Sequence, residues 1–229
     1  MTARFDDQRE VAQARASVYR FLTRLYGGPP TAELLSAVAG LDFHKLLEAV
    51  FGEATQPFLD AVAAGPDPEA LRLEYDALFR VPGDWYLRPF ESVYRGRQVV
   101  DGQVVDGTVW GRWTKEVQRL YALAGAELAG GAGELPDFIA VELDFMAFLC
   151  TREAEALAAG DGELARHFLA LQKEFLVEHL SRWVDTLGDE MRAMARSGFY
   201  AGLAEMTQAF VSADCVQVQA AWSAGVTGT

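Results

Sequence analysis

Apolar residues recur with the spacing of an α-helix along most of the chain. Residues 5–26 place an apolar stripe between arginines and aspartates, which predicts an amphipathic first helix that ends at Gly27. Further helices are predicted over residues 32–39, over residues 43–64, and from Pro68 until shortly before Pro82. Thr31 and Asp67 precede two of these helices and are expected to cap them. The stripe on the first helix consists of Val11, Ala14, Val18, Phe21, Leu22 and Leu25.

The same periodicity resumes in the second half of the chain. It predicts helices over residues 108–128, from Pro136 to about residue 158, from Asp161 to about residue 187, and over residues 189–212. Breaks are expected at Gly160 and Gly188, and a flexible joint at Gly130, Gly131 and Gly133. The pattern predicts an all-α fold of about eight helices. We expect one helical domain over residues 1–212 and a tail over residues 213–229 that either frays or docks on the domain.

Residues 81–107 form the one long irregular segment. They contain the sequence QVVDG twice in tandem, at residues 98–102 and 103–107. Asp-Gly next to paired valines is compatible with a short β-hairpin. Connections of this length are usually functional or mobile, which makes the segment a candidate for binding.

Composition and charge exclude several classes of protein. The 229 residues include 33 acids and 20 lysines and arginines, for a formal net charge of −13. Such a balance argues against binding to nucleic acid or to anionic lipid, because both need a basic surface. We found no secretory signal at the start of the chain and no stretch of about 18 apolar residues to insert into a membrane. A cytoplasmic protein is therefore expected.

Metal and cofactor chemistry find little support in the sequence. Neither the two cysteines nor the three histidines have the spacing of a metal site, and no phosphate-binding loop is present. We therefore predict neither a metal nor a cofactor. Cys150 lies in an apolar helical stretch and is expected to be a buried free thiol. His179 lies on an apolar stripe and is expected at the edge of the core.

Acidic residues stand on the helix predicted to begin at Pro136. This helix is apolar on nearly every side, which is typical of a buried central helix. Asp137 falls in its first turn, where the helix dipole favours a carboxylate. Glu142 and Asp144 lie deeper and need solvent, a basic side chain or a ligand.

Three blocks of sequence resemble the TorD/DmsD family of redox-enzyme maturation chaperones. They are EYDALFRVPG with PFESVY (residues 74–83 and 89–94), ELPDFIAVELDFMAFL (134–149), and LQKEFLVEHLSRWVDTL with FYAGLAEM (171–187 and 199–206). Their order and spacing extend the resemblance over residues 11–211. The resemblance implies an all-helical, non-enzymatic chaperone. Its client would be the twin-arginine signal peptide, or the apo form, of a molybdenum-cofactor oxidoreductase, whose export it delays until the cofactor is inserted.

The resemblance also implies where a client binds. The family pairs an Asp with a His at the start of the central helix; here Asp137 is retained and Phe138 stands in place of the His. An acidic surface would attract the arginines of a leader, and carboxylates would pair with them, while its apolar region occupies a groove. Family members also form domain-swapped dimers, so a monomer or a swapped homodimer is expected. The candidate client-binding residues are Glu91, Ser92, Tyr94, Pro136, Asp137, Phe138 and Glu142.

Two other functions remain compatible with the sequence. The chain could be an all-α enzyme that acts on a small molecule through carboxylates near Glu91, in which case a pocket with raised carboxyl pKa values is expected. It could also be an assembly adaptor that binds folded subunits and no leader.

Overall fold

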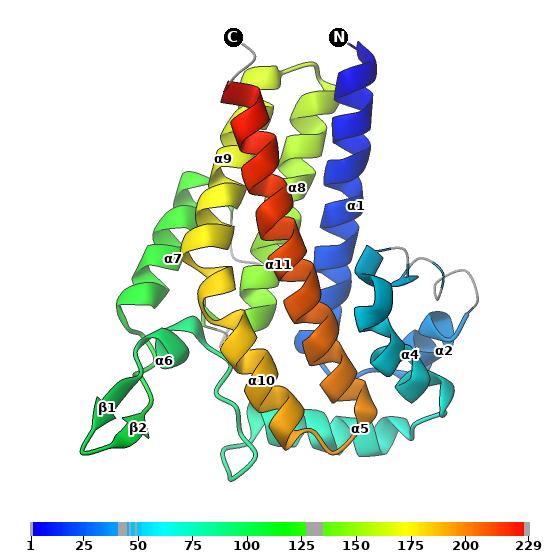
Figure 1. Ribbon diagram of the computed structural model, residues 1–229, viewed down its shortest axis with the longest axis vertical. Helices are drawn as coiled ribbons and strands as arrows, with labels where there is room; N and C mark the ends of the chain where they lie inside the picture. Colours follow the sequence, from blue (N-terminus) through cyan, green and yellow to red (C-terminus); the bar gives the residue numbers. More distant parts are fainter. Residues whose placement is uncertain (1, 41–44, 46, 49, 127–134, 227–229) are drawn as a thin grey trace. The chain divides into compact units, whose positions relative to one another are not determined.

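The computed structural model describes residues 2–40, 45, 47–48, 50–126 and 135–226, and helices dominate it (Figure 1), which confirms the all-α prediction. The chain divides into two compact units. Unit 1 comprises Met1–Arg24, Phe90–Arg182 and Asp214–Thr229, and unit 2 comprises Leu25–Pro89 and Trp183–Ala213. The predicted joint at Gly130, Gly131 and Gly133 lies outside the described residues.

Unit 1 is built around two long neighbouring helices, α8 and α9, which the short turn at residues 159–161 makes antiparallel (Figure 1). The α8 helix is buried on nearly every side, as predicted, and Phe145 on it packs edge-on against Phe175 of α9 at 4.9 Å. Asp161 caps α9 as predicted, because its carboxylate accepts the Leu164 N–H at 2.9 Å. The helices of this unit are α1 (Thr2–Tyr26, to Arg24), α6 (Glu91–Arg95), α7 (Arg112–Leu123), α8 (Ile139–Ala158), α9 (Gly162–Glu178), the 3₁₀ turn η3 (Leu180–Arg182) and the last part of α11 (Gly198–Val226).

The buried face of α1 differs from the predicted stripe. Val11 is 45% exposed and Ala14 is exposed, so this part of the prediction was wrong. The face that is buried contains Ala12, Arg15, Ala16, Tyr19 and Leu22. A stripe chosen by apolar character alone cannot include Arg15, whose burial depends on partners elsewhere in the chain.

Those partners form a buried polar network inside unit 1. The Arg15 guanidinium donates to the Asp214 carboxylate on α11, at 2.9 Å for one of the two bonds, and to the Gln172 side chain on α9 at 2.6 Å. The Tyr19 hydroxyl donates to the same carboxylate at 2.6 Å. Cys150 lies beside Gln172, is fully buried and free as predicted, and burial raises the pKa of its thiol to about 12.

The tandem repeat forms the β-hairpin that its Asp-Gly pairs suggested. Strands β1 (Gln98–Val100) and β2 (Gln103–Val105) are antiparallel, with Val99 directly opposite Val104. Asp101 and Gly102 join them with φ values of 51° and 78°. Two positive φ angles are what a two-residue turn of type I′ requires, and Asp-Gly is a favoured pair there.

Unit 2 confirms the two caps predicted in the first half of the chain. The Thr31 hydroxyl accepts the Leu34 N–H at 3.2 Å, and the Asp67 carboxylate accepts the Glu69 N–H at 3.1 Å. The helix expected over residues 43–64 is interrupted in its described part at Gly52, where φ is 58°. The elements of the unit are α2 (Ala32–Val38), η1 (Gly52–Thr55), α4 (Gln56–Ala63), α5 (Pro68–Tyr75), the π-helical turn η2 (Asp76–Arg80), α10 (Val184–Met194) and the first part of α11.

Predicted helix boundaries near the C-terminus were wrong: the helix expected from Asp161 to about residue 187 ends at Glu178, and residues 189–212 are divided between α10 and α11. Gly188 does not break a helix but lies within α10, where a Cβ would stand 2.5 Å from the Gln208 side chain. The glycine therefore lets this helix pack closely against α11 within unit 2. The last helix does not end near Ser212 but continues to Val226. Within the described residues, no helix is long and apolar enough to span a bilayer.

Candidate functional site

The α6 segment and the residues before α8 lie side by side in unit 1. Phe90 and Phe138 form an isolated antiparallel bridge, and their rings are 5.7 Å apart. The Glu91 N–H donates to the Asp137 carbonyl at 2.9 Å. Two of the sequence blocks are therefore joined through their backbones, and this brings the candidate residues of both together.

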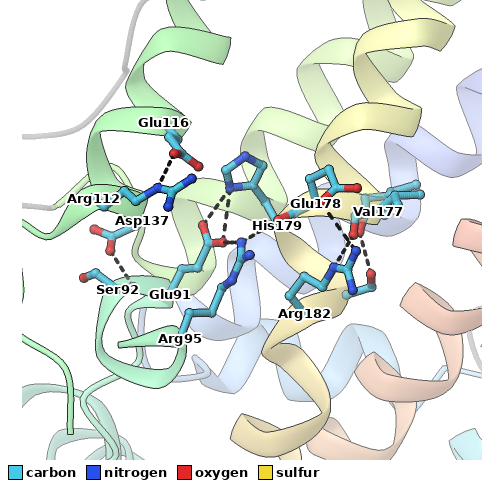
Figure 2. Close-up of polar contacts among 12 residues, drawn as sticks. Glu91, Ser92, Arg95, Arg112, Glu116, Asp137, Val177, Glu178, His179 and Arg182 are labelled. Atoms are coloured by element: carbon cyan, nitrogen blue, oxygen red, sulfur yellow. Dashed lines mark hydrogen bonds and ion pairs between the residues drawn. The ribbon is translucent and has the colours of Figure 1, made fainter. Parts of the chain in front are cut away.

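Asp137 caps α6 from a distant part of the sequence. Phe90 occupies the N-cap position of α6 and its side chain has no oxygen to accept a bond. Instead, the Asp137 carboxylate accepts the Ser92 N–H at 2.9 Å (Figure 2). The prediction that Pro136 opens the following helix was wrong, because α8 begins at Ile139 and Asp137 precedes it.

Glu91 is the centre of a buried ion cluster. Its carboxylate is fully covered and accepts from His179 Nδ1 at 2.9 and 3.1 Å, and from the Arg95 guanidinium (Figure 2). Because a carboxylate only accepts, this contact places a proton on Nδ1 of His179. His179 is 4% exposed and stacks on Phe175 at 5.4 Å, which confirms the expected place at the edge of the core.

Arg95 connects this cluster to the end of α9 and to α7. Besides Glu91, its guanidinium donates to the Glu178 carbonyl at the end of α9. The same group lies 3.4 Å from the centroid of the Trp113 ring, a cation–π contact. The cation that balances Glu91 is therefore held by three different elements of unit 1.

Tyr121 is a buried phenol next to the acids of the site. Its hydroxyl donates to the Pro136 carbonyl at 2.8 Å. Complete burial, followed by the negative charges of Glu142, Glu91, Asp137 and Asp144, holds the pKa of Tyr121 well above its usual range. The bond to Pro136, the neighbour of Asp137 in the sequence, places the phenol of Tyr121 beside the start of α8.

All seven candidate residues are buried. The structure brings Glu91, Ser92, Pro136, Asp137, Phe138 and Glu142 together at the corner of α6 and α8, hereafter the acidic corner. Tyr94 lies beside it with its ring 4.2 Å from the Arg97 guanidinium. Among the described residues of unit 1, a pocket of about 350 Å³ is lined in part by Ser92, and neither this pocket nor another of about 190 Å³ is lined by Glu91, Asp137 or Glu142. Among the described residues, no group of three His, Cys, Asp or Glu side chains is arranged to hold a metal ion.

Sequence reasoning did not find Arg95, Tyr121 or the role of His179 in this corner. The only local signal was the i,i+4 spacing of Glu91 and Arg95, which favours an ion pair on a helix. Tyr121 and His179 come from α7 and from the end of α9, so only the fold brings them to Glu91.

Replacing Asp137 by alanine is expected to cost about 1 kcal/mol of folding free energy, the usual effect of removing a helix cap. Asp137→Asn keeps an oxygen that accepts the Ser92 N–H, so a smaller loss is expected. Urea unfolding of both variants, followed by circular dichroism, measures the difference. Equal stability of the alanine variant and the wild type would show that the contact contributes nothing to the fold.

Comparison with known proteins gives relatives of one kind. A model of the nitrate reductase delta subunit family matches residues 44–188. A selenate reductase assembly chaperone protein of Thauera selenatis is 33% identical over 117 residues, which are 51% of this chain and 54% of that protein. A chlorate reductase assembly chaperone protein of Ideonella dechloratans is 31% identical over 125 residues, 55% of this chain and 59% of that protein. The chain thus matches little more than half the length of these two relatives.

A third relative matches over almost the whole chain. The chaperone protein TorD of Vibrio atlanticus is 24% identical over 219 residues, which cover 91% of this chain and 96% of that protein. The names of all three relatives describe chaperones and no catalytic activity. This agrees with the expectation of a non-enzymatic protein.

Proposed function

The chain belongs to the nitrate reductase delta subunit family, and we propose a function for it on that premise. The resemblance to TorD-type chaperones is confirmed by the same match and by the relative named TorD. From this membership we infer a cytoplasmic maturation chaperone. Its client is the apo form of a molybdenum-cofactor oxidoreductase, bound through a twin-arginine leader, and it holds back export until the cofactor is inserted.

The acidic corner is the observation that carries this proposal. Glu91, Asp137 and Glu142 are buried there, and the chain as a whole carries a formal net charge of −13. The surplus of negative charge creates a potential that favours an approaching cation such as a leader arginine. Because the three carboxylates are covered, their effect on a client that approaches the closed corner is electrostatic. Direct pairing with a client arginine requires α6 to move.

Client binding is expected to weaken as salt is added. Attraction between an acidic protein and a cationic leader is screened when the Debye length falls from about 10 Å at 0.1 M to about 3 Å at 1 M ionic strength. Fluorescence anisotropy of a labelled leader, titrated with the full chain at several salt concentrations, measures the slope. Binding that is unchanged by salt would show that the acidic surface plays no part.

Capture of the client tests the proposed function itself. The tagged chain is used to pull down proteins from anaerobically grown cells, and the captured proteins are identified by mass spectrometry. Recovery of a molybdoenzyme precursor with its leader intact is the expected result. Removing the leader from that precursor should abolish capture, whereas an assembly adaptor would still retain the truncated subunit. Failure to capture any precursor from cells shown to express one would overturn the proposal.

A further inference from the structure

The smaller pocket of unit 1 has two buried charged residues in its wall. It measures about 190 Å³ and lies between α1, α8, α9 and the last part of α11 (Figure 1). Arg15 and Glu153 line it and are only 7% and 9% exposed. None of the seven candidate residues lines it, so the pocket is separate from the acidic corner. The rest of its wall is mainly apolar and consists of Val11, Ala12, Leu169, Val218 and Ala221.

The charges beside this pocket do not balance. The Arg15 guanidinium donates twice to the Asp214 carboxylate and once to the Gln172 side chain. Glu153 lies 3.6 Å from the same guanidinium, beyond hydrogen-bond distance, and accepts a bond from Gln172 at 2.8 Å. The described contacts thus set one guanidinium against two carboxylates, and the hydrogen bonds of that guanidinium go to Asp214 rather than to Glu153.

The Glu153 carboxylate shows the effect of this imbalance. Burial raises the pKa of Glu153, and the bond from Gln172 and the charge of Arg15 oppose this rise without cancelling it. The charge of Asp214 raises the pKa further. The chain itself therefore stabilises the ionised carboxylate incompletely. A cation that enters the pocket would supply the missing charge, because opposite charges attract strongly where water is largely excluded.

Size and wall chemistry indicate which cation fits. Drug-sized ligands occupy clefts of about 300–1,000 Å³, so a pocket of about 190 Å³ suits a single side chain. Long basic side chains lay an aliphatic stem along apolar surface and keep a charged head at its end. The lining residues Asp7, Gln8 and Gln217 are exposed and so form the mouth, where a carboxylate and two amide oxygens can accept from a cation.

We propose that this pocket binds an arginine side chain of the client's leader, whose guanidinium donates to Glu153 and whose stem lies along the apolar wall. A guanidinium is planar, is weakly hydrated and has five N–H donors, so it can serve Glu153 and an amide oxygen together. This inference rests on the proposed function, because the leader of a client contains this side chain. It gives the leader a carboxylate in the wall of a pocket, whereas the carboxylates of the acidic corner are covered.

Peptide binding by the full chain tests the role of charge. The probe is a fluorescein-labelled synthetic peptide with two adjacent arginines followed by about twelve apolar residues, the length of a leader's apolar region. A second probe carries citrulline at both arginine positions, which keeps the shape and removes the charge. Glu153→Gln removes the carboxylate charge and keeps an oxygen for Gln172. Glu155→Gln is the matched control, because Glu155 is an exposed acid on the same helix, paired with Arg152.

A second pair of variants tests the role of the pocket's space. Ala221→Phe places a ring in the pocket wall from an exposed position on α11. Ala220→Phe, its matched control, places the same ring on the neighbouring exposed residue, which does not line the pocket. Both positions lie at the surface, so thermal stability should stay close to that of the wild type.

Glu153→Gln and Ala221→Phe are each expected to bind the arginine probe about tenfold more weakly than the wild type, the scale of one hydrogen bond to a charged group. The wild type should bind the citrulline probe at least about tenfold more weakly than the arginine probe. The losses from citrulline and from Glu153→Gln should not add, because both remove the same charge pair. Glu155→Gln and Ala220→Phe should bind like the wild type. Equal binding of the two probes by the wild type, or full binding by either pocket variant, would overturn the proposal.

Capture of a precursor separates this inference from the proposed function. If the wild type captures a precursor and both pocket variants capture it equally well, the pocket assignment is wrong and the proposed function stands. If the wild type captures no precursor, the proposed function fails and the inference fails with it. Weaker capture by both pocket variants, with full capture by both controls, is the expected result.

Discussion

Replacing Asp214 by alanine is expected to lower the free energy of unfolding by about 3–5 kcal/mol, the cost of breaking a buried ion pair from one side. The change leaves the Arg15 guanidinium, on a residue only 7% exposed, without the carboxylate that accepts two of its hydrogen bonds. It also removes the acceptor of the Tyr19 hydroxyl. Glu153, 3.6 Å away, is too distant to replace those bonds.

Urea unfolding monitored by circular dichroism measures this loss. Glu155→Ala is the control, because it breaks an exposed pair with Arg152 on α8 and should change stability by no more than about 0.5 kcal/mol. The double variant Arg15→Met with Asp214→Leu should lose less than the sum of the two single changes, since neither Arg15 nor Asp214 is then left buried without the other, and Glu153 keeps the hydrogen bond it accepts from the Gln172 side chain. A small effect of Asp214→Ala would contradict the assignment of this ion pair as a main link between α1 and α11.

Replacing Glu91 by alanine is the second change with a large expected effect, a loss of about 3 kcal/mol. His179 and Arg95 lose their common acceptor, and His179 is 4% exposed, so water reaches its Nδ1–H poorly. This loss is at the low end of the range of about 3–5 kcal/mol for a buried ion pair broken from one side, because the Arg95 side chain is 15% exposed and has other partners. Tryptophan fluorescence should also change, since Arg95 lies over the Trp113 ring.

The matched control is Glu116→Ala, which breaks the exposed ion pair between Glu116 and Arg112 on α7. It should change stability by no more than about 0.5 kcal/mol. Glu91→Gln retains an oxygen that accepts from His179 and should lie between the wild type and the alanine variant. If Glu91→Ala were as stable as Glu116→Ala, the ion cluster would not support the acidic corner.

Local signals in the sequence predicted the parts of the fold that are themselves local. The caps at Thr31, Asp67 and Asp161 and the turn at Asp101 depend on neighbours within three residues, and all four are present. The end of α11 could not be predicted in this way. What holds that helix is the bond between Asp214 and Arg15, which are 199 residues apart in the sequence.

The same distinction applies to the acidic corner. The resemblance to a family pointed to Glu91, Asp137 and Glu142 as candidate residues. The fold then brings them together at the acidic corner, where their charges act on Tyr121. Nothing near these residues in the sequence indicated that all three carboxylates are covered, because burial depends on α7 and α9 packing over them. Binding of a client at these residues stays a prediction.

The cap that Asp137 places on α6 has a consequence for the order of folding. A helix of five residues is far below the length at which helices persist alone in water, and α6 has no capping side chain of its own. It can therefore form only after the chain has closed a loop of 45 residues that brings Asp137 to Ser92. We expect the two segments to open as one cooperative unit: losing both bonds that Asp137 accepts from α6, at its carboxylate from the Ser92 N–H and at its carbonyl from the Glu91 N–H, would unwind the helix. Glu91 and Arg95, at the two ends of α6, are then released together from the sites where the folded chain holds them.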